Sequence, residues 1–185
     1  MNTPAYGYKS NKTGQRGVAA VEVALVAIPF FLMLLGGIEF GRLMYLWNTV
    51  QEVTRNAARQ AVVTDFSNPA ALSAIRNSAV FRTDAGSLPA ASEVSDRMIS
   101  IKYIQFDRVT EVTSKPSDPG QNISECLAGT TKCIRYVQVS IQDCTGSSCV
   151  PVSFQPMLGM FSFLGTLTVP VSTVLMPAES LGFTP

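Results

Sequence analysis

The chain has 185 residues, a net charge of +1 at pH 7 and no histidine, and 46% of its residues are hydrophobic. A chain of this length fits one folded domain, and its near-neutral charge gives it no general attraction to nucleic acid. Because it lacks the commonest general base and metal ligand, its composition favours neither an enzyme nor a metal protein, and we expect no nucleic-acid partner, no cofactor and no small-molecule substrate.

The first predicted element is an apolar helix at residues 18–38, in which Glu22 is the only charged side chain. At about 1.5 Å per residue this segment extends roughly 30 Å, which is the thickness of the hydrocarbon core of a bilayer. Lys9, Lys12 and Arg16 precede it without any acidic residue, so the positive-inside rule places the N-terminus in the cytoplasm. A secretory signal peptide is the alternative, but its apolar region is normally shorter and ends in a small-x-small cleavage site.

Pro29 lies inside this apolar segment. Proline removes one backbone donor from a helix and clashes with the preceding turn, which predicts a bend or a melted turn at this point. A harmless kink and a required hinge are both consistent with the sequence.

The helical pattern continues beyond the apolar segment. Hydrophobic residues recur at steps of three and four from Leu43 to Ala61, while Arg42, Arg55 and Arg59 fall on the opposite side. This predicts one helix from about residue 18 to residue 63, whose second half is amphipathic. The expected organisation is therefore a leader at 1–17, a transmembrane helix at 18–38, an extension of that helix at 39–66 and an extracytoplasmic domain at 67–185.

The domain at 67–185 has the pattern of an α+β fold. Asn68-Pro69 is typical of a helix start and predicts a short helix over 68–81. Alternating apolar residues predict strands within 97–107 and 134–143, with further extended segments at 150–154 and 166–176. We interpret 83–96 as a loop and 113–132 as a long polar connection. In the predicted α+β fold the long helix packs against a small antiparallel sheet.

Residues 155–165, "QPMLGMFSFLG", are more apolar than an exposed loop should be. Their aromatic and aliphatic side chains either pack on the sheet or contact a membrane surface or a partner. The sequence leaves both interpretations open.

Four cysteines, Cys126, Cys133, Cys144 and Cys149, lie on the side predicted to be outside the cytoplasm, where disulfides form. Of the three possible connectivities we favour Cys126 with Cys133 and Cys144 with Cys149, because "CTGSSC" is typical of a turn that a short bridge can close. A zinc site is disfavoured, since the spacing is unlike that of zinc knuckles and no histidine is present.

Glu22 is an unusual residue for a membrane segment. An ionised carboxylate costs roughly 2.5–3.5 kcal/mol at the centre of a membrane helix and less near its edge, so Glu22 needs water or a partner. In the uncut chain it can reach water at the cytoplasmic interface. If the chain is cut after Gly17, Glu22 becomes the fifth residue of a new N-terminus, and the α-amine of a neighbouring chain can pair with it and fix the register of stacked helices.

These residues resemble a known family. Arg16-Gly17, the following Val18-Ala19-Ala20-Val21-Glu22, and "GGIEFGRLMYLWNTVQEVTRNAARQAV" are similar to the TadE-like pilus-assembly proteins, which are pilin-like components of the bacterial tight-adherence (Flp) type IV pilus machinery. The resemblance covers about residues 16–63.

The resemblance implies that a prepilin peptidase cuts between Gly17 and Val18 and that Glu22 serves recognition or assembly. It implies a minor pilin-like subunit or assembly factor that supports pilus biogenesis and adherence. The implied partners are other pilin-like subunits, the major Flp-type pilin, the inner-membrane assembly platform and membrane lipid. The implied location is the bacterial inner membrane with the domain in the periplasm, or a surface pilus.

The alternative is a binding module or enzyme tethered by a single span. The sequence shows no phosphate-binding glycine loop, no nucleophile elbow and no combination of nucleophile and base, so we expect no catalytic residues. An Asn122-Ile123-Ser124 triplet matches the glycosylation acceptor pattern, which is often met by chance.

Overall fold

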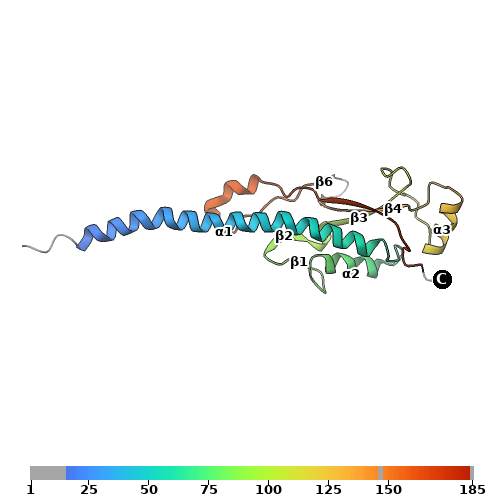
Figure 1. Cartoon of the computed structure of the whole chain (residues 1–185), viewed down its shortest axis with the longest axis horizontal. Helices are drawn as coiled ribbons and strands as arrows, with labels where there is room; N and C mark the ends of the chain where they lie inside the picture. Colours follow the sequence, from blue (N-terminus) through green and yellow to red (C-terminus); the bar gives the residue numbers. More distant parts are fainter. Residues whose placement is uncertain (1–15, 146–147, 184–185) are drawn as a thin grey trace, which may run out of the picture. The chain divides into compact units, whose positions relative to one another are not determined.

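The structure is a computed structural model that describes residues 16–145 and 148–183, and the predicted leader at 1–17 therefore lies almost entirely outside the described residues. The chain divides into two compact units, Met1–Phe40 and Gly41–Pro185. Helix α1, Arg16–Ala61, contributes residues to both units (Figure 1).

Helix α1 confirms the predicted long N-terminal helix to within two residues at each end. Its helical conformation continues without interruption through Pro29, so the melted turn that the proline predicted is absent. Proline fixes φ at a helical value and removes a single donor, and the remaining hydrogen bonds are enough to keep the turn helical.

The second half of α1 supplies one wall of the core of the Gly41–Pro185 unit. Leu46, Val53 and Ala57 are fully buried, and Trp47 packs against the same core. This is the apolar stripe predicted from the sequence. Packing of this stripe in the core stabilises the helix, since an amphipathic helix is stabilised chiefly by the face that it buries.

Helix α2, Pro69–Ala79, follows the predicted start signal. The Asn68 side chain accepts hydrogen bonds from the backbone N–H groups of Ala70 and Ala71, and Pro69 occupies the first helical position. This cap satisfies donors that a helix N-terminus leaves unpaired. Ile75 and Ala79 bury the inner face of the helix in the core.

A three-stranded antiparallel sheet lies at the centre of the unit. Its strands are β3 (Ile99–Ile104), β4 (Tyr136–Ile141) and β7 (Thr173–Pro177), in the order β3-β4-β7. Val139 of β4 pairs with Ile101 of β3 and with Val174 of β7. Together with α1 and α2 this sheet confirms the predicted α+β class, and β7 at the sheet edge agrees with the proline-containing sequence around it.

Two segments interpreted as irregular are regular in the structure. The segment predicted to be a loop contains a small hairpin of β1 (Ser87–Leu88) and β2 (Ala91–Ser95), followed by the 3-10 helix η1 (Asp96–Met98). The predicted polar connection contains helix α3, Pro119–Leu127, whose N-cap Asp118 accepts a hydrogen bond from the Gln121 N–H.

The remaining elements belong to the C-terminal part of the chain. A second hairpin pairs β5 (Asp143–Thr145) with β6 (Ser148–Val150), and the 3-10 helix η2 covers Gly159–Thr166. Beyond β7 the chain returns to the end of α1, where the N–H groups of Glu179 and Leu181 both donate to the Val62 carbonyl. Gly182 then adopts a φ of +82°, and a Cβ atom built on it would lie 2.5 Å from the backbone nitrogen of Asp65.

Candidate functional site

The segment from residue 18 to residue 38 exposes apolar side chains around its whole circumference. Val21, Val23, Phe30 and Met33 are all more than half exposed, and they fall on different sides of the helix. Among the described residues, α1 is the one helix that is long and apolar enough to cross a membrane by length and composition. A helix that is apolar on all sides requires an apolar environment, which is either lipid or neighbouring helices.

Glu22 interrupts this apolar surface near its beginning. Its carboxylate is exposed, and within the described residues it makes no hydrogen bond or ion pair. Glu22, Val26 and Phe30 lie one turn apart on one helix face, and with Val23 and Ala27 they line a shallow groove of about 420 Å³. Small Ala27 in the middle of this groove gives space for the side chain of another helix.

Gly17 lies in the first turn of α1, next to the predicted cleavage point before Val18. A Cβ atom built on Gly17 would meet no described atom within 4 Å. Local packing in the described chain therefore does not require glycine at this position.

A charged cluster that the sequence did not predict lies inside the Gly41–Pro185 unit. Arg42 was expected on the solvated side of α1, but its side chain is 10% exposed and that of Glu93 in β2 is 1% exposed. The Arg42 Nη1 atom lies 3.2 Å from Glu93 Oε1 and 3.3 Å from the Ala90 carbonyl oxygen. Arg42 also donates to the Gln155 carbonyl, and its guanidinium lies 4.5 Å from the centre of the Phe154 ring.

This cluster fastens α1 to the β1–β2 hairpin and to the segment that follows β6. Its members are far apart in sequence, which is why a pattern along the chain could not reveal their contact. The sequence around Glu93 offers only a weak signal, which is its position between the apolar residues Ala91 and Val94. The geometry of the cluster is structural, because its ion pair and hydrogen bonds join three separate segments of the domain.

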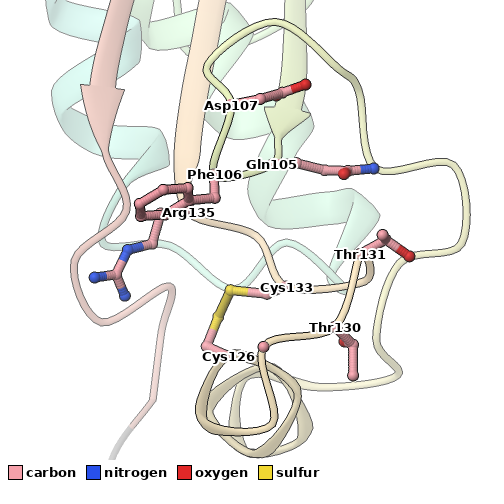
Figure 2. A pocket seen from close by; sticks show the side chains of 9 residues that line it. Gln105, Phe106, Asp107, Cys126, Thr130, Thr131, Cys133 and Arg135 are labelled. Atoms are coloured by element: carbon pink, nitrogen blue, oxygen red, sulfur yellow. A yellow bond between two sulfur atoms is a disulfide. The ribbon is translucent and has the colours of Figure 1, made fainter.

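A hollow in the domain lies between the end of β3, helix α3 and the start of β4 (Figure 2). Its volume is about 540 Å³, and its wall includes Gln105, Asp107, Arg135 and the Cys126–Cys133 disulfide. Hydrogen bonds from the Thr110 hydroxyl and from the backbone of the same turn hold the pKa of Asp107 below its ordinary value. The Asp107 carboxylate is thus occupied in ordering its own turn.

The walls of this hollow are loops closed by the Cys126–Cys133 disulfide. Thr130 is part of the wall, and its hydroxyl donates to Glu125 Oε2 at 2.6 Å. Within residues 16–145 and 148–183 no cluster of three or more acidic, cysteine or histidine side chains could hold a metal ion.

The structure contains two disulfides, and they join the pairs that the sequence favoured. Cys126 at the end of α3 is bonded to Cys133 ahead of β4, with a Cα–Cα distance of 4.7 Å. Cys144 and Cys149 bridge the β5–β6 hairpin as a directly opposed pair, with a Cα–Cα distance of 4.1 Å. Each bridge closes a short loop, as in domains that fold in an oxidising compartment.

Asn122 of α3 also links this helix to the segment before β4, next to the Cys126–Cys133 disulfide. It is buried, its Oδ1 accepts from the Ile134 N–H at 2.8 Å, and its Nδ2 donates to the Ile134 carbonyl at 3.3 Å. The glycosylation triplet that begins at Asn122 therefore has its acceptor nitrogen engaged inside the folded domain.

Taken together, these features define a protein with one candidate membrane-spanning helix that continues into a disulfide-containing α+β domain. Residues 17–59 match the family model described as TadE-like protein, so the resemblance seen in the sequence is confirmed over this segment. The matched segment includes Gly17, Glu22 and Arg42 and ends within α1. No match was found among the curated proteins, and none among the solved structures.

Proposed function

We propose that the protein is a pilin-like minor subunit or assembly factor of a bacterial tight-adherence pilus, anchored in the inner membrane by residues 18–38 with its domain in the periplasm. The observation that carries this proposal is the coincidence of the TadE-like match with an all-round apolar helix that contains a single carboxylate, Glu22. Its role is assembly and not catalysis, and it supports pilus biogenesis and surface adherence.

In this proposal a prepilin peptidase removes residues 1–17 and the mature chain begins at Val18. Packing in the described chain does not require glycine at position 17, which supports the interpretation that the peptidase recognises this glycine. Cleavage places a new α-amine at Val18, and this amine of one chain can approach Glu22 of a neighbouring chain among helices of the same kind.

An ion pair at this position explains why the carboxylate is tolerated. Isolated in lipid, Glu22 is costly, whereas opposite a neighbour's amine the attraction is strong because the surroundings have a low dielectric constant. The groove formed by Val23, Val26, Ala27 and Phe30 beside Glu22 gives the adjoining apolar contact. Glu22 thereby fixes the axial position of one helix against the next, as do buried polar residues in other helical assemblies. The partners are other pilin-like subunits, the major Flp-type pilin and the membrane assembly platform.

Intact-mass measurement of the protein isolated from its native host tests the processing step. The expected mass is that of a chain starting at Val18, and retention of residues 1–17 contradicts the proposal. A Gly17→Leu variant, whose Cβ would meet no described atom within 4 Å, should keep its leader while the domain remains folded.

Substitution of Glu22 tests the assembly step. Glu22→Ala should abolish surface fibres, because the neighbour's amine then lacks its counter-charge. The matched control is Glu52→Ala, which removes an exposed carboxylate from the same helix outside the apolar segment and should leave fibres unchanged. Fibre formation at the wild-type level by Glu22→Ala rules out this role. A single-span tethered enzyme or binding module predicts both that result and an uncut N-terminus.

A further inference from the structure

The segment from Met157 to Leu167, which includes η2, leaves large apolar side chains uncovered; it is called the apolar loop here and is drawn in orange in Figure 1. Met157 is 75% exposed, Met160 57% and Phe163 66%. Leu164 packs against the domain core and fixes the loop in place from its inner side. The loop is therefore anchored on one face and presents the other, apolar face outward, so it is only partly packed on the domain.

The apolar loop and the chain on either side of it carry no charged side chain. Residues 144–178 contain no Asp, Glu, Lys or Arg. The turn after β3 offers a contrast, because Phe106 and Val109 are also strongly exposed but Asp107 and Arg108 stand between them. That turn is solvated by its own charges, whereas the apolar loop has no charged side chain of its own.

The loop follows directly on the segment that Arg42 of α1 contacts. Arg42 stands four residues after Ile38, which is about 6 Å along a helix. Arg42 donates to the Gln155 carbonyl, and Phe154 lies under its guanidinium. Met157 is two residues beyond Gln155, so even an extended chain keeps it within about 7 Å of that contact. With the length of the arginine side chain included, this path from residue 38 to the start of the apolar loop is roughly 20 Å long.

We propose that the apolar loop is a second membrane contact, in which Met157, Met160 and Phe163 insert into the headgroup–acyl boundary of the bilayer on the side of the domain. This inference rests on the proposed membrane anchoring of residues 18–38 and extends it. Membrane-surface segments commonly bury their apolar face to this depth. Because the loop has no basic residues, its attraction to lipid is apolar and does not depend on anionic headgroups or on salt. The contact gives the domain a fixed orientation on the membrane.

The test uses the full chain reconstituted in phosphatidylcholine vesicles at low protein density. Phe163→Trp places a fluorescent probe in the loop, and Phe106→Trp places one at a comparably exposed phenylalanine in the charged turn. Trp47 is the only native tryptophan and contributes equally to both variants, so the wild-type signal can be subtracted. The quenchers are lipids brominated at a depth of about 5–10 Å and, separately, aqueous acrylamide.

The loop probe of Phe163→Trp should emit at shorter wavelength and lose on the order of half its emission to the brominated lipid, since the proposed depth places it among the bromines. The turn probe of Phe106→Trp should respond to acrylamide and not to lipid. Equal responses of the two probes overturn the proposal. If the loop probe is protected from acrylamide only as protein density rises, the proposal is also overturned, because such protection indicates contact with a second copy. An effect that requires anionic lipid contradicts it as well.

Flotation of the same vesicles reports separately on the anchor. If the chain does not float with lipid, the anchoring by residues 18–38 has failed. If the chain floats and the loop probe still stays in water, only the loop inference has failed. Intact mass and fibre formation with Glu22→Ala do not depend on this outcome, so the assembly proposal is judged independently.

Discussion

Removal of the Glu93 carboxylate should destabilise the domain far more than removal of a surface carboxylate with the same ion-pair distance. Glu93→Ala removes the buried carboxylate of the Arg42–Glu93 ion pair, in which the Glu93 side chain is 1% and the Arg42 side chain 10% exposed. Breaking a buried pair in this way costs about 3–5 kcal/mol. For a domain of this size, a loss of 1 kcal/mol lowers Tm by roughly 2–4 °C, so Tm should fall by roughly 6–20 °C.

Glu111→Ala is the matched control. The Lys102–Glu111 pair has the same N–O distance of 3.2 Å, but its side chains are 45% and 43% exposed. Exposed pairs contribute about 0–1 kcal/mol because water and salt screen them. Tm should therefore change by no more than a few degrees, about 4 °C at the upper limit.

Thermal unfolding of the full chain in lipid nanodiscs gives the measurement, with Trp47 fluorescence reporting on the core against which that side chain packs. The double variant Arg42→Met/Glu93→Leu should recover part of the loss, since it removes both charges and leaves apolar groups of similar size. Equal Tm shifts for Glu93→Ala and Glu111→Ala would refute the reasoning, because burial would then have no effect on the cost.

Three further changes test other parts of the fold by the same thermal assay or by titration. Asn122→Ala should cost about 2–4 kcal/mol, because two hydrogen bonds are lost and the Ile134 backbone groups stay buried without partners; a loss below about 1 kcal/mol argues against this. Gly182→Ala should lower the stability of the domain clearly more than Gly129→Ala. Both glycines have positive φ, but a Cβ on Gly182 would lie 2.5 Å from a backbone nitrogen, whereas a Cβ on Gly129 would have nothing within 4 Å. Burial raises the pKa of Tyr103 to about 12, so its contribution to stability is full below about pH 10 and is lost as the pH rises toward 12, because the unfolded chain ionises first. Tyr103→Phe should reduce this alkaline loss without lowering stability at neutral pH, and ultraviolet titration of tyrosine should lose its latest-ionising component.

Local sequence patterns were sufficient for the elements that have strong periodicity or capping signals. The apolar stripe from Leu43 to Ala61 predicted the second half of α1, and Asn68-Pro69 predicted the start of α2. Helix α3 begins with Asp118-Pro119, which is the same signal, but its polar composition concealed it. The β1–β2 hairpin was missed because its residues are mostly small and its buried side chains, such as Leu88 and Val94, are few.

Only those parts of the candidate site whose residues lie close together in sequence were predictable. Gly17 and Glu22 belong to one short apolar segment, and their positions were read directly from the sequence. The contact of Arg42 with Glu93 joins residues 51 positions apart, and it depends on how the hairpin packs on α1. No spacing rule along the chain contains that information, so the arginine was placed in water when it is in fact buried.

The buried position of Asn122 has a practical consequence for producing the protein. In a eukaryotic secretory host the Asn122-Ile123-Ser124 triplet can receive a glycan on the nascent chain before α3 docks. A sugar on Nδ2 removes one of its hydrogens and introduces a bulk that the contact with the Ile134 carbonyl does not admit. Material for biophysical work should therefore come from a bacterial periplasm, where the disulfides can form and this modification is not made.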